Sequence, residues 1–239
     1  MSSVITIDHV CKSYGACKAV SDLTLSLNAG EILGFLGTNG AGKTTTIKML
    51  LGFFPPDTGQ ISVFGQNPSD AHTRQRVGFM PETAYYYPYL NIYELLSFYG
   101  GLCGMPSALI RQRTEELIVA TGLENAGTRL LKTYSKGMLQ RAGIAQAILH
   151  DPDLLILDEP FTGLDPLARI HLRDLILDLK AKGKTILFSS HELSEAELMC
   201  DRIAIMKAGA LVLDKPMTEV AGDGNTNLER IFLNVLKSS

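Results

Sequence analysis

The residues with the clearest chemistry form a glycine-rich loop at positions 37–44, which read Gly-Thr-Asn-Gly-Ala-Gly-Lys-Thr. The loop follows the apolar stretch 31–36, so the pattern predicts a strand, a loop and a helix that opens at Thr44. Its glycines let the backbone turn N–H groups inward toward an anion, which a chance glycine-rich turn would not need. Lys43 is expected to reach the β- and γ-phosphates of a nucleotide, and the Thr44 hydroxyl to ligate Mg²⁺. The predicted nucleotide-binding residues are Gly37, Thr38, Asn39, Gly40, Ala41, Gly42, Lys43, Thr44 and Thr45.

Two adjacent carboxylates follow a second apolar run, 153–157. The run is short enough for a strand buried on both faces, and Asp158 and Glu159 stand at its end. Open parallel sheets bind ligands just beyond the carboxyl ends of their strands. We therefore expect Asp158 to hold Mg²⁺ and Glu159 to polarise the water that attacks the γ-phosphate. The alternative is a pair of solvated acids that cap a strand end.

A histidine follows a third apolar run, Thr185–Ser190. If this run is also a strand of the parallel sheet, His191 reaches the same edge as Asp158 and Glu159. An imidazole there could donate to a γ-phosphate oxygen or hold Glu159 and the water in line. A lone histidine is otherwise usually a hydrogen-bonded surface or core group.

A predicted helix over Lys136–His150 begins directly after Ser135, a good N-cap residue. A capped helix start with a glycine at its mouth is an anion site, although an ordinary surface helix can begin in the same way. The expected buried stripe of this helix consists of Met138, Leu139, Ile144, Ala145 and Ile148.

The order of these segments resembles the ATP-binding subunits of ATP-binding-cassette (ABC) transporters. The family signature, commonly Leu-Ser-Gly-Gly-Gln, here reads Tyr134-Ser135-Lys136-Gly137-Met138. Tyr14 matches the aromatic residue that stacks on adenine, and His191 matches the switch histidine. Residues 78–82 match the Q-loop, and residues 163–166 match the D-loop. The whole resemblance extends from about Val4 to Val212.

The resemblance implies two ATP molecules held with Mg²⁺ between two head-to-tail subunits. Ser135, Lys136, Gly137 and Met138 would then contact the nucleotide of the other subunit. Because the chain has one phosphate loop and one signature, it needs a second copy of itself or a homologous subunit. The further partner implied by the family is a transmembrane permease.

Two positions depart from the usual family pattern. Glu82 stands where the Q-loop usually has glutamine, and its carboxylate can still ligate Mg²⁺. Lys136 replaces a signature glycine, and its ammonium could face either solvent or the opposite phosphate. Both variants resemble the export-type branch whose permeases belong to the ABC-2 class. Importer ATPases and non-transport ABC ATPases that act on ribosomes or nucleic acid remain the alternatives.

The composition excludes several other classes. The 239 residues are 46% hydrophobic and carry a net charge of −3, so no basic surface for nucleic acid is expected. No apolar run is long enough to span a bilayer, and the first residues do not resemble a signal peptide. We expect a cytoplasmic protein held at the membrane through its permease, with its four cysteines reduced.

The predicted fold is α/β. A P-loop NTPase core with a mostly parallel sheet would carry a small antiparallel β-subdomain and an inserted α-helical subdomain. Residues 1–239 would form one domain, with the core and β-subdomain at about 1–83 and 148–212 and the helical part at about 84–147. The tail, about 213–239, would contain a loop at 222–227 and an amphipathic helix, Leu228–Leu236. Further predicted helices are Ile92–Leu102 and Ile110–Thr121, and a hairpin turn is expected at Lys207–Ala210.

Four tyrosines lie between Tyr85 and Tyr89, directly after the Q-loop. Tyrosine suits interfaces because one end is apolar and the other polar. In the family this region receives the coupling helix of the membrane subunit, so these side chains are predicted to contact the permease. The alternative is a tyrosine-rich loop that packs on its own helical subdomain.

Overall fold

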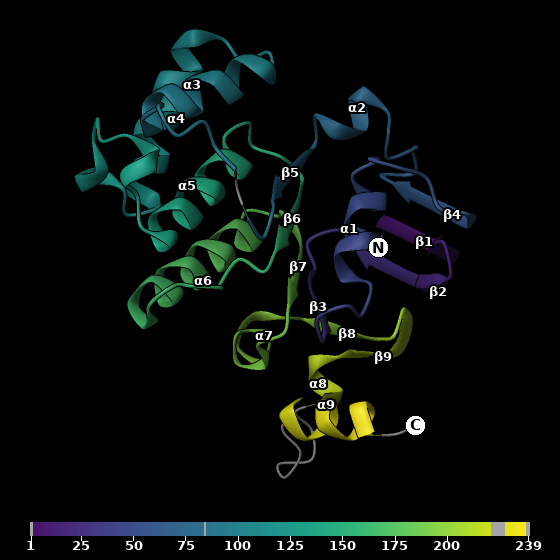
Figure 1. Ribbon diagram of the computed structural model, residues 1–239. Coiled ribbons are helices and arrows are strands. Elements are labelled where there is room, and N and C mark those ends of the chain that lie inside the picture. The colour runs from purple at the N-terminus through teal and green to yellow at the C-terminus, as the bar shows by residue number, and fades with distance from the viewer. Residues whose placement is uncertain (1, 84, 221–227, 238–239) are drawn as a thin grey trace.

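The computed structural model describes residues 2–83, 85–220 and 228–237, which form two sheets surrounded by helices (Figure 1). The strands are β1 (Ser3–Tyr14), β2 (Cys17–Asn28), β3 (Ile32–Gly37), β4 (Thr58–Val63), β5 (Val77–Met80), β6 (Leu154–Asp158), β7 (Thr185–Ser190), β8 (Arg202–Lys207) and β9 (Ala210–Pro216). The helices are α1 (Lys43–Leu50), α2 (Ala71–Arg74), α3 (Ile92–Leu102), α4 (Ser107–Ala120), α5 (Lys136–Ile148), α6 (Pro166–Ala181), α7 (Leu193–Met199), α8 (Met217–Val220) and α9 (Leu228–Lys237). The predicted α/β fold class is confirmed.

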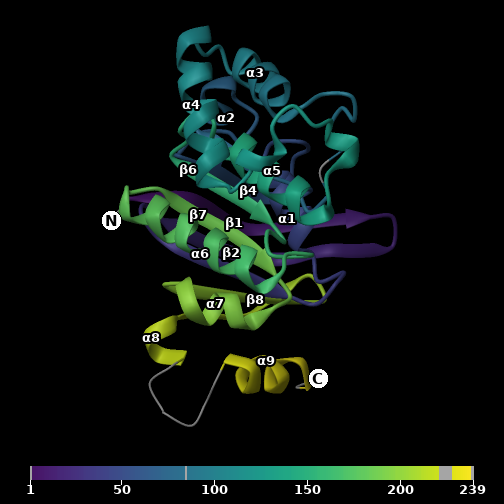
Figure 2. The same ribbon diagram turned by 90° about the vertical axis from the view of Figure 1, so that its left-hand side faces the viewer.

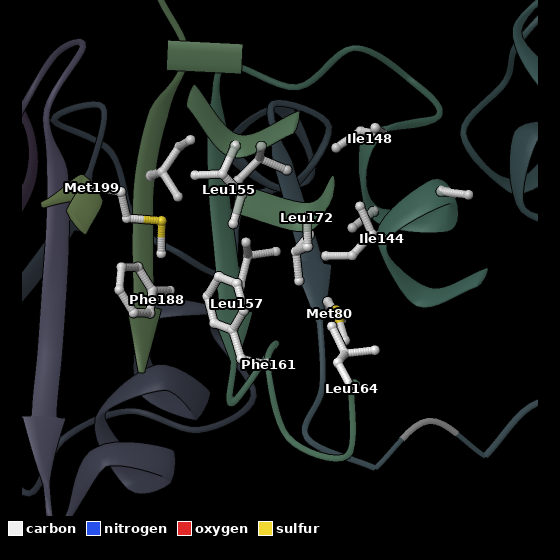
Figure 3. Close-up of a cluster of buried hydrophobic side chains, with 14 of the residues drawn as sticks. Met80, Ile144, Ile148, Leu155, Leu157, Phe161, Leu164, Leu172, Phe188 and Met199 are labelled. Carbon is white, nitrogen blue, oxygen red and sulfur yellow. The ribbon is translucent and has the colours of Figure 1, made fainter. Parts of the chain in front are cut away.

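The larger sheet has six strands in the order β5-β6-β7-β3-β8-β9, and only β9 runs antiparallel to its neighbour. Every residue of β3, β6 and β7 is buried, as continuous apolar strands of a parallel sheet must be. Their side chains alternate between two hydrophobic clusters. Leu155, Leu157 and Phe188 face the cluster that contains α5 and α6, and Figure 3 shows them opposite Ile144 and Leu172.

The smaller sheet is antiparallel, with the order β2-β1-β4. Helix α1 lies between the two sheets (Figure 1), and Figure 2 shows the molecule turned by 90°. Its Ile47 and Leu50 pack with strand residues of both sheets, including Leu23 of β2 and Phe35 of β3. The helix that begins at the phosphate loop is therefore held from both sides.

Helices α3, α4 and α5 gather at one end of the molecule (Figures 1 and 2). Helix α3 has the predicted bounds and starts with a capping box, in which Asn91 and Glu94 exchange hydrogen bonds of 2.8 and 3.0 Å. Helix α4 begins at Ser107, three residues before the predicted Ile110. Helix α5 runs from this group to the larger sheet, where a Cβ added at Gly78 of β5 would lie 2.1 Å from the Ala147 carbonyl oxygen.

The end of the described chain packs on α7. Leu228 and Phe232 of α9 are buried in one cluster with Ala196 and Met199 of α7, which confirms the predicted amphipathic helix. The predicted turn between β8 and β9 is also confirmed, whereas the predicted loop at 222–227 lies outside the described residues. Each helix of the described part of the chain is too short or too polar to cross a bilayer.

Candidate functional site

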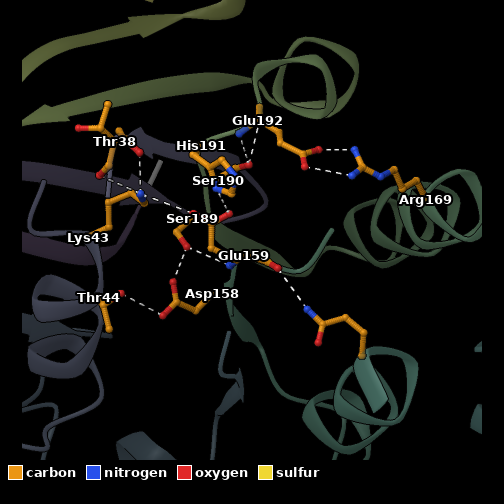
Figure 4. Close-up of polar contacts among 12 residues, drawn as sticks. Thr38, Lys43, Thr44, Asp158, Glu159, Arg169, Ser189, Ser190, His191 and Glu192 are labelled. Carbon is orange, nitrogen blue, oxygen red and sulfur yellow. Dashed lines mark hydrogen bonds and ion pairs between the residues drawn. The ribbon is translucent and has the colours of Figure 1, made fainter. Parts of the chain in front are cut away.

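Three neighbouring parallel strands bring the predicted catalytic residues to one edge of the larger sheet. Strands β6, β7 and β3 end there side by side and are followed by Glu159, His191 and the phosphate loop. Figure 4 shows Lys43, Asp158, Glu159 and His191 in one group of polar contacts. Adjacent parallel strands explain this convergence, because their carboxyl ends point the same way.

The side chain of Lys43 folds back onto the phosphate loop. The Lys43 ammonium donates to the Gly37 carbonyl oxygen at 2.6 Å and lies 3.5 Å from Oε1 of Glu159. Gly42 adopts a φ of 105°, and a Cβ there would lie 2.4 Å from the Ala19 carbonyl oxygen, so this position requires glycine. Helix α1 starts at Lys43, one residue before the predicted Thr44, and its first N–H groups can face an anion.

Asp158 and Thr44, the last residue of this loop, bring two side-chain oxygens together. The Thr44 hydroxyl donates to Oδ2 of Asp158 at 3.3 Å, and the Ser189 hydroxyl donates to Oδ1 at 2.5 Å. Burial raises the pKa of Asp158, although these two hydrogen bonds act in the opposite direction.

This donor set fits Mg²⁺. Magnesium prefers oxygen ligands, and it commonly binds through one or two carboxylates together with substrate phosphates. The Lys43 ammonium lowers the pKa of Asp158 less than burial raises it, so this carboxylate would gain from such an ion. No group of three or more His, Cys, Asp or Glu residues suited to a metal occurs among the described residues, so phosphate oxygens would have to complete the shell.

Glu159 is buried and connects the phosphate loop to His191. Its Oε2 lies 2.8 Å from Nδ1 of His191, while Oε1 faces Lys43. Its backbone is left-handed, with a φ of 52°, and Pro160 follows. The carboxylate is therefore held between a cation and an imidazole, where a general base of phosphoryl transfer could act.

Several contacts of the Glu159 backbone and of the segment after His191 were missed by the sequence analysis. The Ser189 hydroxyl accepts from the Glu159 N–H at 3.0 Å, and Nε2 of Gln140 donates to the Glu159 carbonyl oxygen at 3.2 Å. Arg169 of α6 forms a two-pronged pair with Glu192, the residue after His191, and Glu192 raises the pKa of the Arg169 guanidinium. These contacts join segments that are far apart in the sequence. The helical and strand periodicities of the sequence therefore contain no signal that predicts them.

The signature segment starts α5 as predicted. Ser135 is its N-cap and accepts from the Met138 N–H at 3.2 Å, and the helix ends at Ile148 rather than at His150. Within the expected stripe, Ile144, Ala145 and Ile148 are buried, whereas Met138 and Leu139 are half-buried.

Lys136 of the signature is exposed, and its hydrocarbon chain lies over the D-loop. A Cβ added at Gly163 would come within 2.7 Å of Cδ of Lys136. In the described chain, no hydrogen bond or ion pair joins Ser135 or Lys136 to residues 37–45. The signature and phosphate loop of one chain are thus separate anion-binding features.

The remaining predicted ligands lie at the surface. Tyr14 is 51% exposed and packs edge-on against Phe54, with ring centroids 6.1 Å apart. Glu82 is exposed, and no hydrogen bond or ion pair of the described residues connects it to Thr44 or Asp158. The structure therefore does not bring Glu82 to the other two predicted metal ligands.

The tyrosines after the Q-loop do not share one environment. Tyr85, Tyr87 and Tyr89 are 92%, 59% and 74% exposed. Tyr86 instead packs against Tyr99, with ring centroids 6.4 Å apart, and burial raises its pKa. Tyr86 therefore fits the alternative of packing on the helical part of its own chain, and the permease contact stays a prediction for these tyrosines.

Comparisons with known proteins agree with this geometry. A family model described as "ABC transporter" matches residues 20–162, more than half of the chain. An uncharacterised ABC transporter ATP-binding protein of Nostoc sp. is 49% identical over 205 residues, which are 85% of this chain and 61% of that protein. A Nod factor export ATP-binding protein of Burkholderia orbicola is 42% identical over 216 residues, 89% of this chain and 71% of that protein.

A solved structure described as the ATP-binding subunit of an ABC transporter has the same fold. The TM-score is 0.89 at 32% identity, and the match covers 97% of this chain and 99% of the other. The chain spans less than two thirds of the length of the Nostoc relative. On its sequence, its fold and the matched family model, the chain belongs to the ABC transporter family, among its ATP-binding proteins.

Proposed function

We propose that this chain binds ATP with Mg²⁺ and hydrolyses the γ-phosphate bond. The observation that carries the proposal is the position of Glu159, whose carboxylate lies 2.8 Å from His191 and 3.5 Å from Lys43 beside Asp158. Glu159 would accept a proton from the attacking water, and His191 would keep that carboxylate and the water in line. Lys43 would exchange its contact with Gly37 for the β- and γ-phosphates.

Separate parts of the chain would contact the phosphates, the adenine and the Mg²⁺ of the nucleotide. The loop from Gly37 to Thr45 would surround the phosphates, and the exposed Tyr14 ring would stack on adenine. Thr44 and Asp158 would hold Mg²⁺, with Glu82 as a further candidate if the Q-loop moves toward them. When bound, this ion would neutralise charge on the phosphate oxygens.

The chain would work as a pair. Ser135, Lys136, Gly137 and Met138 form an exposed or half-exposed helix start that has no hydrogen bond or ion pair with the described phosphate loop of the same chain. A second copy, or a homologous subunit, would place its ATP there in a head-to-tail dimer. ATP would draw the two subunits together, and hydrolysis would release them.

The partner of this pair would be an ABC-2 class permease that exports its substrate. The name of the Burkholderia relative supports export. Tyr85, Tyr87 and Tyr89 offer exposed aromatic surface for a membrane subunit, and the chain would lie on the cytoplasmic face of the membrane. No nucleic acid partner is expected at a net charge of −3.

The first test is Glu159→Gln. The amide cannot act as a general base, so ATP turnover should fall by about 10²–10⁴-fold while ATP still binds. Turnover and nucleotide affinity would be measured beside Glu115→Gln, a control at an exposed position of α4 that should behave like the parent. Parental turnover in Glu159→Gln would remove Glu159 as the base.

The same variant also tests the partner. With ATP and Mg²⁺ it should accumulate as a closed dimer, which can be captured from gently solubilised native membranes. A multi-spanning membrane protein in near-equal amount would support the transporter proposal. Capture of ribosomes or soluble proteins alone would favour a non-transport ABC ATPase.

A further inference from the structure

The backbone at Glu159 has a conformation that its own sequence opposes. Its φ of 52° lies in the left-handed region, which residues with a Cβ rarely adopt. Pro160 restricts the preceding residue further, toward extended conformations. A residue in this state persists only where its surroundings hold it. The position of the carboxylate therefore depends on whatever fixes the Glu159 peptide.

Three hydrogen bonds of the described chain hold the Glu159 backbone. Its N–H donates to the Ser189 hydroxyl at 3.0 Å, and its carbonyl oxygen accepts from the Thr162 N–H and from Nε2 of Gln140, each at 3.2 Å. Thr162 belongs to the same turn, and Ser189 comes from the adjacent strand β7. Among the described residues, Gln140 makes the one hydrogen bond that reaches the Glu159 backbone from the helical part of the chain.

The Gln140 side chain is placed for this single contact. Gln140 is only 4% exposed, and an uncharged amide is buried at a cost unless its polar atoms are bonded. Its backbone is part of α5, whose next residues, 142–145, are all buried. The amide is therefore carried by a rigid helix rather than by a loop.

Helix α5 connects two functional regions. Its N-cap Ser135 stands five residues before Gln140, in the signature segment that would meet the ATP of the opposite subunit. A helix moves as one body over so short a distance, since each turn is bonded to the next. A displacement of the signature would thus reach the Glu159 carbonyl through one side chain.

We propose that Gln140 is a positioning residue that couples the signature helix to Glu159 of the same subunit. Contact between the signature and the opposite ATP sets the position of α5, and Gln140 then holds the Glu159 carbonyl so that its carboxylate faces the water. The inference rests on the proposed ATP hydrolysis. It adds a reason why each subunit would hydrolyse ATP only when its own signature is occupied.

The experiment compares Gln140→Met with Gln146→Met in the full-length chain. Methionine has about the length of glutamine but no N–H donor. Gln146 is a half-buried control in the same helix. Gln140→Met should lower kcat for ATP by about tenfold, as expected for one lost buried hydrogen bond, with KM unchanged. Gln146→Met should match the parent. Unchanged kcat in Gln140→Met would overturn the proposal.

A second pair of variants separates positioning from a structural role. Gln140→Glu keeps the shape but places a carboxylate against the Glu159 carbonyl, so kcat should fall further. In the Glu159→Gln background, Gln140→Met should cause no additional loss in single-turnover rate, because its effect passes through the Glu159 carboxylate. An equal loss in both backgrounds, or a rise in KM with a lower Tm, would indicate a structural role and overturn the coupling.

The outcomes also distinguish this inference from the proposed function. Parental turnover in Glu159→Gln would remove the proposed base and, with it, the basis for Gln140. An inactive Glu159→Gln with a normal Gln140→Met would leave ATP hydrolysis in place and reject only the coupling. If Gln140→Met does not fold, Gln140→Asn provides the same comparison, because it keeps a neutral amide but is too short to reach the Glu159 carbonyl oxygen.

Discussion

At the scale of single residues, Asp158 places a carboxyl group at a buried strand end. Burial raises its pKa above the ordinary value, so the charged form destabilises the nucleotide-free fold at neutral pH. That cost begins to decline as the pH falls through the raised pKa and is gone only below the ordinary value of 3.8, where the carboxyl is protonated in both the folded and the unfolded state. The same negative charge would bind Mg²⁺.

Asp158→Asn should therefore stabilise the free protein and abolish its response to Mg²⁺ and ATP. We expect Tm at pH 7 to rise by about 2–4 °C, the shift that about 1 kcal/mol produces in a domain of this size. The gain should shrink as the pH falls through the raised pKa toward the ordinary value of 3.8, and thermal unfolding over a pH series that starts at 7 measures it. Asp174→Asn, at an exposed position of α6, is the control. A lower Tm at pH 7 would mean that the bonds from Ser189 and Thr44 outweigh the cost of burial.

At the scale of elements, α6 is tied to the segment around α7 by two arginines one turn apart. Arg169 pairs with Glu192, and its Nε also donates to the Leu164 carbonyl oxygen of the D-loop at 3.2 Å. Arg173 pairs with Glu195 at 2.9 and 3.2 Å. The Glu192 side chain is 30% exposed and follows His191 directly, whereas the Glu195 side chain is 5% exposed.

These differences predict that two matched variants affect stability and ATP turnover to different extents. Arg173→Gln leaves a nearly buried carboxylate without its cation, so it should lower the free energy of unfolding by about 3 kcal/mol. Arg169→Gln should lower it by about 1 kcal/mol or less, since both partners are partly solvated. Its main effect should be slower ATP turnover, because it frees the segment that carries His191. Denaturant unfolding and ATPase assays compare the two, and the reverse order would contradict this assignment.

At the scale of the whole molecule, the tyrosines after the Q-loop divide between interior and surface. The Tyr86 hydroxyl is buried without a hydrogen-bond partner in the described structure, whereas Tyr87 is exposed and packs edge-on against Phe98 at 5.6 Å. A buried hydroxyl without a partner destabilises the fold. The two neighbours therefore make separate predictions.

Tyr86→Phe should raise Tm by about 2–4 °C, because it removes about 1 kcal/mol of uncompensated desolvation. Tyr87→Ala should leave the ATPase activity of the isolated chain intact and reduce transport by the complex with its permease. Thermal unfolding, ATPase and transport assays on both variants test this division. Equal loss of ATPase and transport in Tyr87→Ala would count against a docking role for the exposed tyrosines.

The sequence alone determined the features that are encoded locally. Glycine spacing at 37–44 and apolar runs that end in Asp158-Glu159 and in His191 were sufficient to predict the strands and the edge of the sheet where they meet. Local signals also predicted the N-cap at Ser135 and the bounds of α3. Such patterns are readable because each depends on residues within one or two turns or on a single strand.

Only the tertiary structure decided which distant residues support the site. The contacts of Gln140 with Glu159 and of Arg169 with Glu192 join segments 19 and 23 residues apart, and no periodicity specifies them. The same holds for Tyr86 and Tyr87, since two neighbouring tyrosines have the same propensity and differ only in what packs against them. The physical reason is that burial and hydrogen-bond pairing are set by how elements pack, and packing is a property of the whole chain.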